Sequence, residues 1–176
     1  LSFATTYYSR ANTAWNIAST WSTSACGGAA AVTTPTATDD VIICETYTVN
    51  IGTTGTCRSL TINGTANYTA GVATSVGTGG VIINSGGNIT GTAAGVITTT
   101  GGLVLNSVLT STSVSIRTIT TPGQTISGTG SLGRLDVSIN TINNGNITVT
   151  TALLSTVASS LTQGVSSSLT YNGNTL

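Results

Sequence analysis

Short apolar triplets recur at a nearly constant spacing along most of this chain. The last five begin 22 residues apart, and the first two precede their successors by 19 and 21 residues. Strands this short cannot bury an apolar face alone, so such a repeat is typical of coils that stack on one another. The repeat predicts an all-β fold, a right-handed parallel β-helix (β-solenoid) with coils of about 22 residues. The triplets are Val41-Ile42-Ile43, Leu60-Thr61-Ile62, Val81-Ile82-Ile83, Leu103-Val104-Leu105, Thr125-Ile126-Ser127, Ile147-Thr148-Val149 and Leu169-Thr170-Tyr171.

A second series of apolar residues runs in phase with the triplets, and a third series is looser. The second comprises Val76, Ile97, Ile119, Ile142 and Val165, and the third comprises Ile89, Val114-Ser115-Ile116, Leu135-Asp136-Val137 and Val157. We therefore expect three short strands in each coil, with inward positions such as Ile82 and Leu105 carrying the stability. An antiparallel sandwich is the alternative fold, but its hairpins do not require one phase to persist through successive strands.

The residues between the triplets suit the corners and outer walls of a solenoid. Thr favours outward strand positions, because its branched Cβ suits a strand and its hydroxyl stays in water. Gly, of which the chain has 22, and Asn adopt the positive φ angles that tight corners need. Asn63, Asn84 and Asn106 follow three successive triplets. We expect their amides to form a hydrogen-bonded ladder.

Aromatic residues are concentrated before the repeat begins. Residues 1–38 contain both Trp, the only Phe and two of the five Tyr. The first coil of a solenoid exposes apolar core, so we expect residues 1–38 to form an N-terminal cap on a solenoid of residues 39–176, within one structural domain. Trp15 and Trp21 are expected in the core of that cap, and a platform that stacks on sugars is their alternative role.

A series of short motifs fills residues 5–62. They are Thr6-Tyr7-Tyr8-Ser9-Arg10, Ala14-Trp15-Asn16, Thr20-Trp21-Ser22, Cys26-Gly27-Gly28, Pro35, Asp39-Asp40-Val41-Ile42-Ile43-Cys44, Thr48-Val49 and Ser59-Leu60-Thr61-Ile62. This opening resembles that of bacterial cell-surface parallel β-helix proteins, found in large surface proteins of Bacteroidetes and in surface proteins of the mannose-sensitive haemagglutinin pilus locus. It departs from them at Ala14, where Gly is common. The resemblance implies export, a role at the cell surface or in the extracellular matrix, and no catalytic residues.

The chain has three cysteines, which in an exported protein suggests one disulfide and one free thiol. If Val41 and Leu60 stack, Cys44 and Cys57 lie about six positions apart along the wall, too far for a disulfide. We therefore expect Cys26 to bond either Cys44 or Cys57 and to join the cap to the solenoid.

Charged side chains are scarce, with four basic and four acidic residues and no His. We expect Asp39 and Asp40 to bond nearby backbone amides or to pair with Arg10 or Arg58, with half of a calcium site as the alternative. Beyond residue 58 the only charged residues are Arg117, Arg134 and Asp136. Arg134 and Asp136 are two apart, so we expect them to share a strand face and form a surface pair.

This composition excludes several classes of function. The chain has too few acids and bases for polysaccharide cleavage, so we expect no enzyme, no catalytic residues and no metal or cofactor site. Four basic residues are too few to neutralise many phosphates, so we expect no nucleic-acid partner. We also expect no membrane insertion, because no stretch approaches the roughly 20 apolar residues of a membrane helix.

Two functions remain for a secreted, extracellular or cell-surface protein of this kind. The first is structural: a subunit or module of a surface filament or matrix, built by head-to-tail stacking of solenoids, with the chain itself as partner. The second is an adhesive or glycan-binding module of a larger surface protein, although only Tyr68 and Tyr171 are aromatic beyond residue 47. An open last coil exposes unpaired backbone groups, which the next copy would cover. The expected assembly interface is Leu1, Phe3, Tyr7 and Tyr8 at one end and Leu169, Tyr171 and Leu176 at the other.

Overall fold

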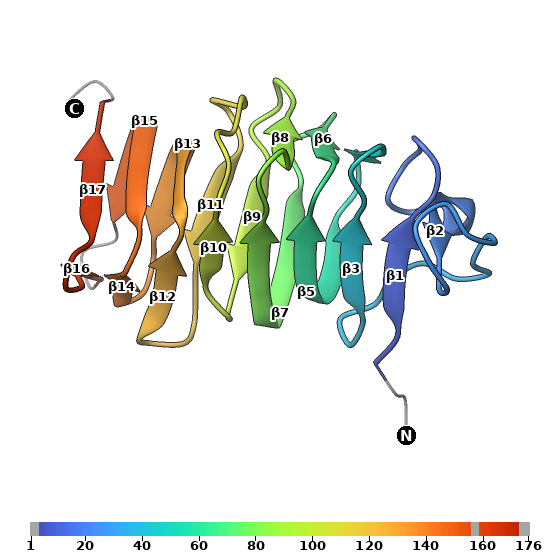
Figure 1. Cartoon of the computed structure of the whole chain (residues 1–176), viewed down its shortest axis with the longest axis horizontal. Coiled ribbons are helices and arrows are strands. Elements are labelled where there is room, and N and C mark those ends of the chain that lie inside the picture. The colour runs from blue at the N-terminus through green and yellow to red at the C-terminus, as the bar shows by residue number, and fades with distance from the viewer. Residues whose placement is uncertain (1–3, 156–158, 173–176) are drawn as a thin grey trace.

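A computed structural model of the chain describes residues 4–155 and 159–172. These residues form a parallel β-solenoid of about seven turns, with the cap at one end and β16 and β17 at the other (Figure 1). Apart from the single 3-10 turn η1 (Ala18–Thr20), the described residues contain no helix, and none of their segments is a helix able to cross a membrane. The all-β parallel solenoid that the repeat predicts is confirmed.

Each turn contributes up to three strand segments, which stack into three walls. Face 1 consists of β3 (Asp40–Ile43), the second parts of β5 (Gly55–Ile62) and β7 (Ala73–Ile83), β10 (Leu103–Leu105), β12 (Gln124–Ser127), β14 (Thr141–Asn143) and β16 (Leu161–Gln163). Face 2 consists of β4 (Thr48–Ile51), β6 (Thr65–Tyr68), β8 (Asn88–Thr90), the first parts of β13 (Thr129–Val137) and β15 (Asn146–Ser155), and β17 (Ser168–Tyr171). Face 3 consists of the first parts of β5 and β7, β9 (Val96–Thr99), β11 (Ser115–Thr118), and the second parts of β13 and β15.

Bent strands join the faces. The pairing register shifts between Cys57 and Ser59 in β5 and between Leu132 and Arg134 in β13, where each strand turns a corner. Between β8 and β13, face 2 continues through an irregular segment in which Val108 bridges to Ser131. These corners let consecutive turns differ in length without losing the parallel ladders.

Alternate residues of each strand point inward and form columns along the solenoid axis. On face 1 the column is Val41, Leu60, Val81, Leu103, Ile126 and Asn143, all buried. Leu105 is also inward, with none of its surface exposed. Ile82 is aligned with Thr61 and Val104 on the outer side of the same strands, so the prediction that it points inward is wrong. Its neighbours Val81 and Ile83 take the inward places because strand side chains alternate.

The spacing between turns is shorter and less regular than the predicted 22 residues, at about 19 residues for a typical coil. The triplets at Val41, Leu60, Val81 and Leu103 stack as predicted. Leu103 then aligns with Ile126 rather than Thr125, a slip of one residue that leaves Thr125 exposed. Hydrophobic alternation selects Ile126 for the core, because a one-residue slip reverses which side chains face inward.

The last two triplets and the second apolar series are also placed differently. The triplets beginning at Ile147 and Leu169 pair with each other, but they lie on face 2 and not above Leu103. The members of the second series do not stack on one another. Val76 is aligned with Thr99 on the next turn, and Ile97 is aligned with Thr74 and Ile116 on its two neighbouring turns. Ile142 is aligned with Thr125 and Thr162. Val165 is 99% exposed in a turn, and Ile119 follows the end of β11. Of the third series, Ile116 and Leu135 stack on face 3, Ile89 belongs to face 2, and Val157 lies outside the described residues.

The cap closes the N-terminal end of the stack. Its strand β1 (Thr6–Ser9) pairs in parallel with β3 and antiparallel with β2 (Trp21–Ser22). Trp15 and Trp21 are buried against each other in an edge-to-face contact with ring centroids 5.1 Å apart. The indole N–H of Trp21 donates a hydrogen bond of 2.8 Å to the Trp15 carbonyl. Trp15 also donates its backbone N–H to the Asn50 carbonyl, so the cap covers the outer edge of β4 as well as that of β3.

One disulfide fixes the cap to the first turn. Cys26 bonds Cys44, which directly follows β3, and their Cα atoms are 6.0 Å apart. The predicted disulfide between cap and solenoid is confirmed, and the structure selects Cys44 as the partner. Cys57 is a free thiol buried inside face 3. Burial, with Asp40 nearby, raises the pKa of the Cys57 thiol to about 12.

Candidate functional site

The two ends of the solenoid differ in how their strand edges are satisfied. At the N-terminal end, β1 has a partner on both sides. At the other end, β16 pairs only with β14, and β17 pairs only with β15, among the described residues. Ser168 and Asn172 donate their backbone N–H groups to Gly145 and Val149 of the previous turn. Because N–H directions alternate along a strand, those of Leu169 and Tyr171 point away from β15.

The residues expected to form an assembly interface have different environments. Tyr7 is buried in the cap core, and its hydroxyl hydrogen bonds with that of Thr33 over 2.7 Å. Tyr8 is half-buried on the outer side of face 1, where it aligns with Ile42. Leu169 and Tyr171 are half-buried on β17. Leu1, Phe3 and Leu176 lie outside the described residues.

Face 2 presents a polar outer wall that the sequence patterns did not single out. Its outward residues are Thr48 and Asn50, Thr65 and Asn67, Asn88 and Thr90, Thr129 and Ser131, Asn146 and Thr148, and Ser168 and Thr170. All of these side chains are uncharged hydroxyls or amides. The charged side chains of the described chain lie on the cap, on faces 1 and 3, or at corners. Strand alternation within face 2 would have revealed the wall, had its strands been assigned correctly.

Side chains link successive turns along the N-terminal half of this wall. Asn67 donates its amide to the Asn50 side-chain oxygen over 2.8 Å, and Thr90 donates to the Asn67 side-chain oxygen over 3.0 Å. Asn88 and Thr110 are linked in the same way over 3.0 Å. The amide groups of this half are therefore bonded within the protein, whereas the hydroxyls of Thr48 and Thr65 make no hydrogen bond to a described residue.

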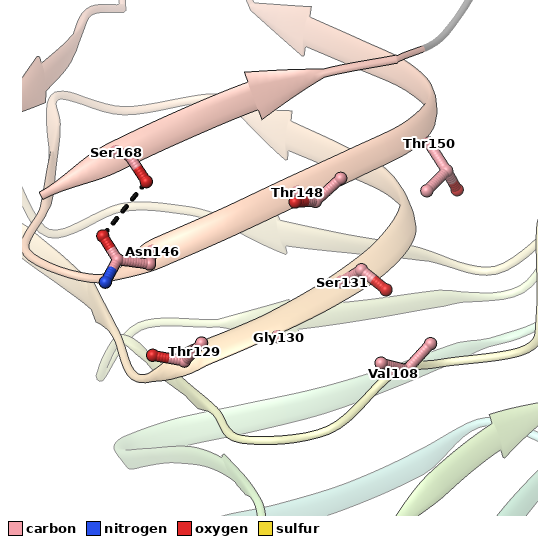
Figure 2. Close-up of a pocket in the computed structure, with 8 residues that line it drawn as sticks. All are labelled: Val108, Thr129, Gly130, Ser131, Asn146, Thr148, Thr150 and Ser168. Atoms are coloured by element: carbon pink, nitrogen blue, oxygen red, sulfur yellow. Dashed lines mark hydrogen bonds between the residues drawn. The ribbon is translucent and has the colours of Figure 1, made fainter.

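The C-terminal half of the wall is hollowed into a shallow depression of about 520 Å³ (Figure 2). Val108, Thr129, Gly130, Ser131, Asn146, Thr148, Thr150 and Ser168 line it, and these residues come from four successive turns. The Ser168 hydroxyl donates to the Asn146 side-chain oxygen over 3.0 Å, as Figure 2 shows. The hydroxyls of Thr129, Ser131 and Thr148 make no hydrogen bond to any described residue and face solvent. Val108 adds an apolar surface that is 70% exposed.

Aromatic rings do not contribute to this wall as a sugar platform would require. Tyr68 points into the core with only 1% of its surface exposed, and its hydroxyl donates to Thr74 over 2.7 Å. Burial raises the pKa of Tyr68, despite the opposing effect of the Thr74 hydrogen bond. Trp15 and Trp21 are enclosed in the cap. Tyr171, at the edge of the last described turn, is half-buried.

The two acids before β3 bond local groups rather than a metal. Asp39 accepts hydrogen bonds from the backbone N–H groups of Thr5 and Thr36 and from the Thr36 hydroxyl. Burial alone would raise the pKa of Asp39, but these hydrogen bonds outweigh it and the pKa is lowered. Asp40 forms an ion pair with Arg58, one of the two expected arrangements. Within residues 4–155 and 159–172, no group of three or more metal-binding side chains occurs.

Asp136 pairs with Arg117 over 2.6 Å, so the predicted Arg134–Asp136 pair is wrong. In the parallel register, Arg117 of β11 lies directly opposite Asp136 of β13. Adjacent strands are about 4.8 Å apart, whereas residues two apart along one strand are nearly 7 Å apart. The partner across the ladder is therefore closer than the partner along the chain.

The expected asparagine ladder forms over only one step. Asn84 donates its side-chain amide to the Asn63 side-chain oxygen over 2.7 Å. Asn106 aligns with the same corner through its backbone N–H, which donates to Ile83, but its side chain makes no bond to Asn84. This ladder has a structural role, joining two turns at the corner between faces 1 and 2.

Comparison with known proteins identifies no relative: no family model, no curated protein and no solved structure matches this chain. The β-solenoid architecture alone is established for this chain.

Proposed function

We propose that this chain is a structural module of an extracellular filament or surface layer, in which β-solenoids stack head to tail. The observation that carries the proposal is the asymmetry of the two ends. The cap satisfies the outer edges of β3 and β4, whereas β17 pairs on one side only among the described residues and the N–H of Leu169 points away from the stack. A further coil, from the same chain or from another copy, pairs with such an edge as the turns pair with one another.

An extracellular location is supported by two further features. The Cys26–Cys44 disulfide is of a kind that persists in oxidising compartments. The opening of the chain resembles that of exported bacterial β-helix proteins, which are surface components. We accordingly assign no enzymatic role and name the chain itself as the partner at the open edge.

The strand pairing of the cap favours one proposed contact for a second copy over another. Strand addition directly to β1 requires the two-residue strand β2 to move, because β1 already has two partners. The open edge of β16 and β17 is therefore proposed to meet the cap of the next copy. Contact between unlike ends does not close on itself and propagates an unbranched filament.

Electron microscopy of the purified chain tests this proposal, with filaments expected and dispersed single particles contradicting it. The Leu169→Pro variant removes an N–H that points away from β15 and should abolish filaments while the β-type circular dichroism spectrum is kept. Leu169→Val is the matched control, because it changes the side chain but keeps the N–H, and it should still assemble. Deleting residues 1–8 is a poor test, since it also removes Tyr7 from the cap core.

Adhesion to a glycan is the second candidate function, and the depression of face 2 favours it. Because Tyr68 is buried, contact with a sugar there relies on hydroxyl and methyl groups rather than on that ring.

A further inference from the structure

The polar wall of face 2 is uncharged along its whole described length, which limits what it binds. A strongly charged polymer gains no ion pair there, since the outward residues are Thr, Ser and Asn with Val108 beside them. Seven turns at about 4.8 Å, each presenting a strand roughly 13 Å long, give a wall of about 400 Å². A stable dimer needs about 800 Å² from each partner. The wall alone is therefore too small and too polar to hold a second copy.

Within the wall, the depression combines a hollow with three hydroxyls that have no partner among the described residues, whereas other such hydroxyls, those of Thr48 and Thr65 among them, lie outside this hollow. The amide and hydroxyl groups of Asn50, Asn67 and Thr90 bond one another. The hydroxyls of Thr129, Ser131 and Thr148 have no partner among the described residues, and Figure 2 shows them on neighbouring strands along the depression. These groups can donate and accept hydrogen bonds without first breaking a bond inside the protein.

The lining also mixes hydroxyls with methyl groups. Each Thr offers a methyl group beside its hydroxyl, and the exposed Val108 extends the apolar part. Sugar rings have the same mixture, with hydroxyls at their edges and C–H groups on their faces. The lining residues span four turns, so the depression runs about 14 Å along the solenoid axis, the length of a few sugar rings.

We propose that this depression binds a segment of a neutral polysaccharide lying along the solenoid axis. Thr129, Ser131 and Thr148 supply hydrogen bonds, and Val108 with the threonine methyl groups contacts the ring faces. The inference rests on the second candidate function above and is independent of head-to-tail stacking, because one chain contains the whole depression. In a filament the depressions repeat along the axis, so weak single contacts add up through avidity.

Binding to insoluble cellulose, mannan and starch, measured by co-sedimentation, tests the site. The wild-type chain should be retained on at least one of them and not preferentially on polygalacturonate. The triple variant Thr129→Val, Ser131→Ala, Thr148→Val keeps the shape of the wall but removes three hydroxyls, and should lower the affinity about tenfold or more. The matched control Thr125→Val, Ser127→Ala, Thr162→Val makes the same changes on the outer side of face 1, and should bind as the wild type does.

Several outcomes would overturn the inference. They are retention on none of the three neutral polymers, equal binding by the two triple variants, or stronger binding to polygalacturonate. Circular dichroism and thermal melts of each variant separate lost binding from lost folding. The filament proposal can fail separately, because a chain that forms no filaments under the microscope can still be tested for binding to the polysaccharides by co-sedimentation.

Discussion

The first five turns and the last turns of face 1 fill the narrow core with different kinds of side chain. In the first five turns the inward column of face 1 is aliphatic, with Val41, Leu60, Val81, Leu103 and Ile126 stacked in register. In the later turns polar groups enter the interior, and Asn143 occupies the same column. Its side chain donates to Gln163 and to the Ser168 carbonyl, each over 3.0 Å, and accepts from the Gly145 N–H over 3.1 Å.

One inward column of face 3 also changes from aliphatic to polar before Val137 makes it aliphatic again, whereas a second column has the buried Thr74 ahead of Ile97. Cys57 and Val76 are followed in the first of these columns by Thr99 and Thr118, all of them buried. The Thr118 hydroxyl hydrogen bonds with that of Thr141 over 2.9 Å. An aliphatic column is stabilised by burial in any register that keeps it inward, whereas a buried amide needs specific partners. The comparison teaches that face 1 is held by hydrophobic burial in its first turns and also by paired polar groups in its last turns.

The largest effect is expected from a charge placed inside the aliphatic part. Leu105→Asp should prevent folding, because an unpaired buried carboxylate costs at least several kcal/mol against a total stability of about 5–15 kcal/mol. Val104→Asp is the matched control, since Val104 lies next to it on the outer side of β10 and is only half-buried. Soluble expression and circular dichroism distinguish the two, and a folded Leu105→Asp protein would contradict the inward column.

Removing the disulfide should loosen the first turns selectively. The bond between Cys26 and Cys44 spans 18 residues, and removing a disulfide that closes a loop of that length lowers the free energy of unfolding by about 3 kcal/mol. The double variant Cys26→Ala, Cys44→Ala should therefore melt earlier, with faster hydrogen exchange in β1 and β3 than in β13 and β15. Uniform loss of protection along the solenoid would show that the two regions unfold as one unit.

Cys57 should stay unreactive to thiol reagents at pH 8 in the folded protein, because its pKa is raised to about 12.

In the later turns, replacing the buried polar residue of the column by an aliphatic one should lower the stability. Asn143→Ala should cost about 2 kcal/mol, because it leaves the buried Gly145 N–H without its acceptor. Asn143→Leu restores an aliphatic side chain but should not recover the stability, since the same N–H stays unpaired. Chemical denaturation measures both variants. If Asn143→Leu is as stable as the wild type, the later turns are held by burial like the first ones.

The smallest effect is expected at the junction of cap and first turn. Asp39→Asn should cost about 1 kcal/mol at pH 7, because an amide accepts more weakly than a carboxylate from Thr5 and Thr36. The pKa of Asp39 is lowered in the folded protein, so its contribution is present above about pH 4 and is lost as pH falls through the folded pKa. Melting temperatures from pH 7 to pH 2 should therefore fall more steeply for the wild type than for the variant. Parallel curves would contradict this role.

The same division between regions explains where prediction from the sequence worked. The triplets at Val41, Leu60, Val81 and Leu103 were aligned correctly, because aliphatic alternation in these turns is strong and uninterrupted. From Thr125 onward the alignment failed, because inward positions there include Asn143 and Thr141, which look like loop or surface residues in a sequence. The depression of face 2 was not predicted, since Thr129 and Ser131 belong to no apolar triplet and Thr148 lies in a triplet that the repeat aligned with the wrong face.

The sequence by itself determined the solenoid, its cap and the need for a disulfide between them. These follow from local properties: the alternation of aliphatic residues within each strand, the recurrence of the triplets, and the gathering of aromatic residues before the first one. Only the tertiary structure decided that Cys44 rather than Cys57 meets Cys26, that Arg117 rather than Arg134 meets Asp136, and that Asn143 lies inside. Each of these depends on which residue of one turn lies opposite which residue of the next. That register is set by the length of every corner and by hydrogen bonds between turns, and a single strand's pattern does not contain it.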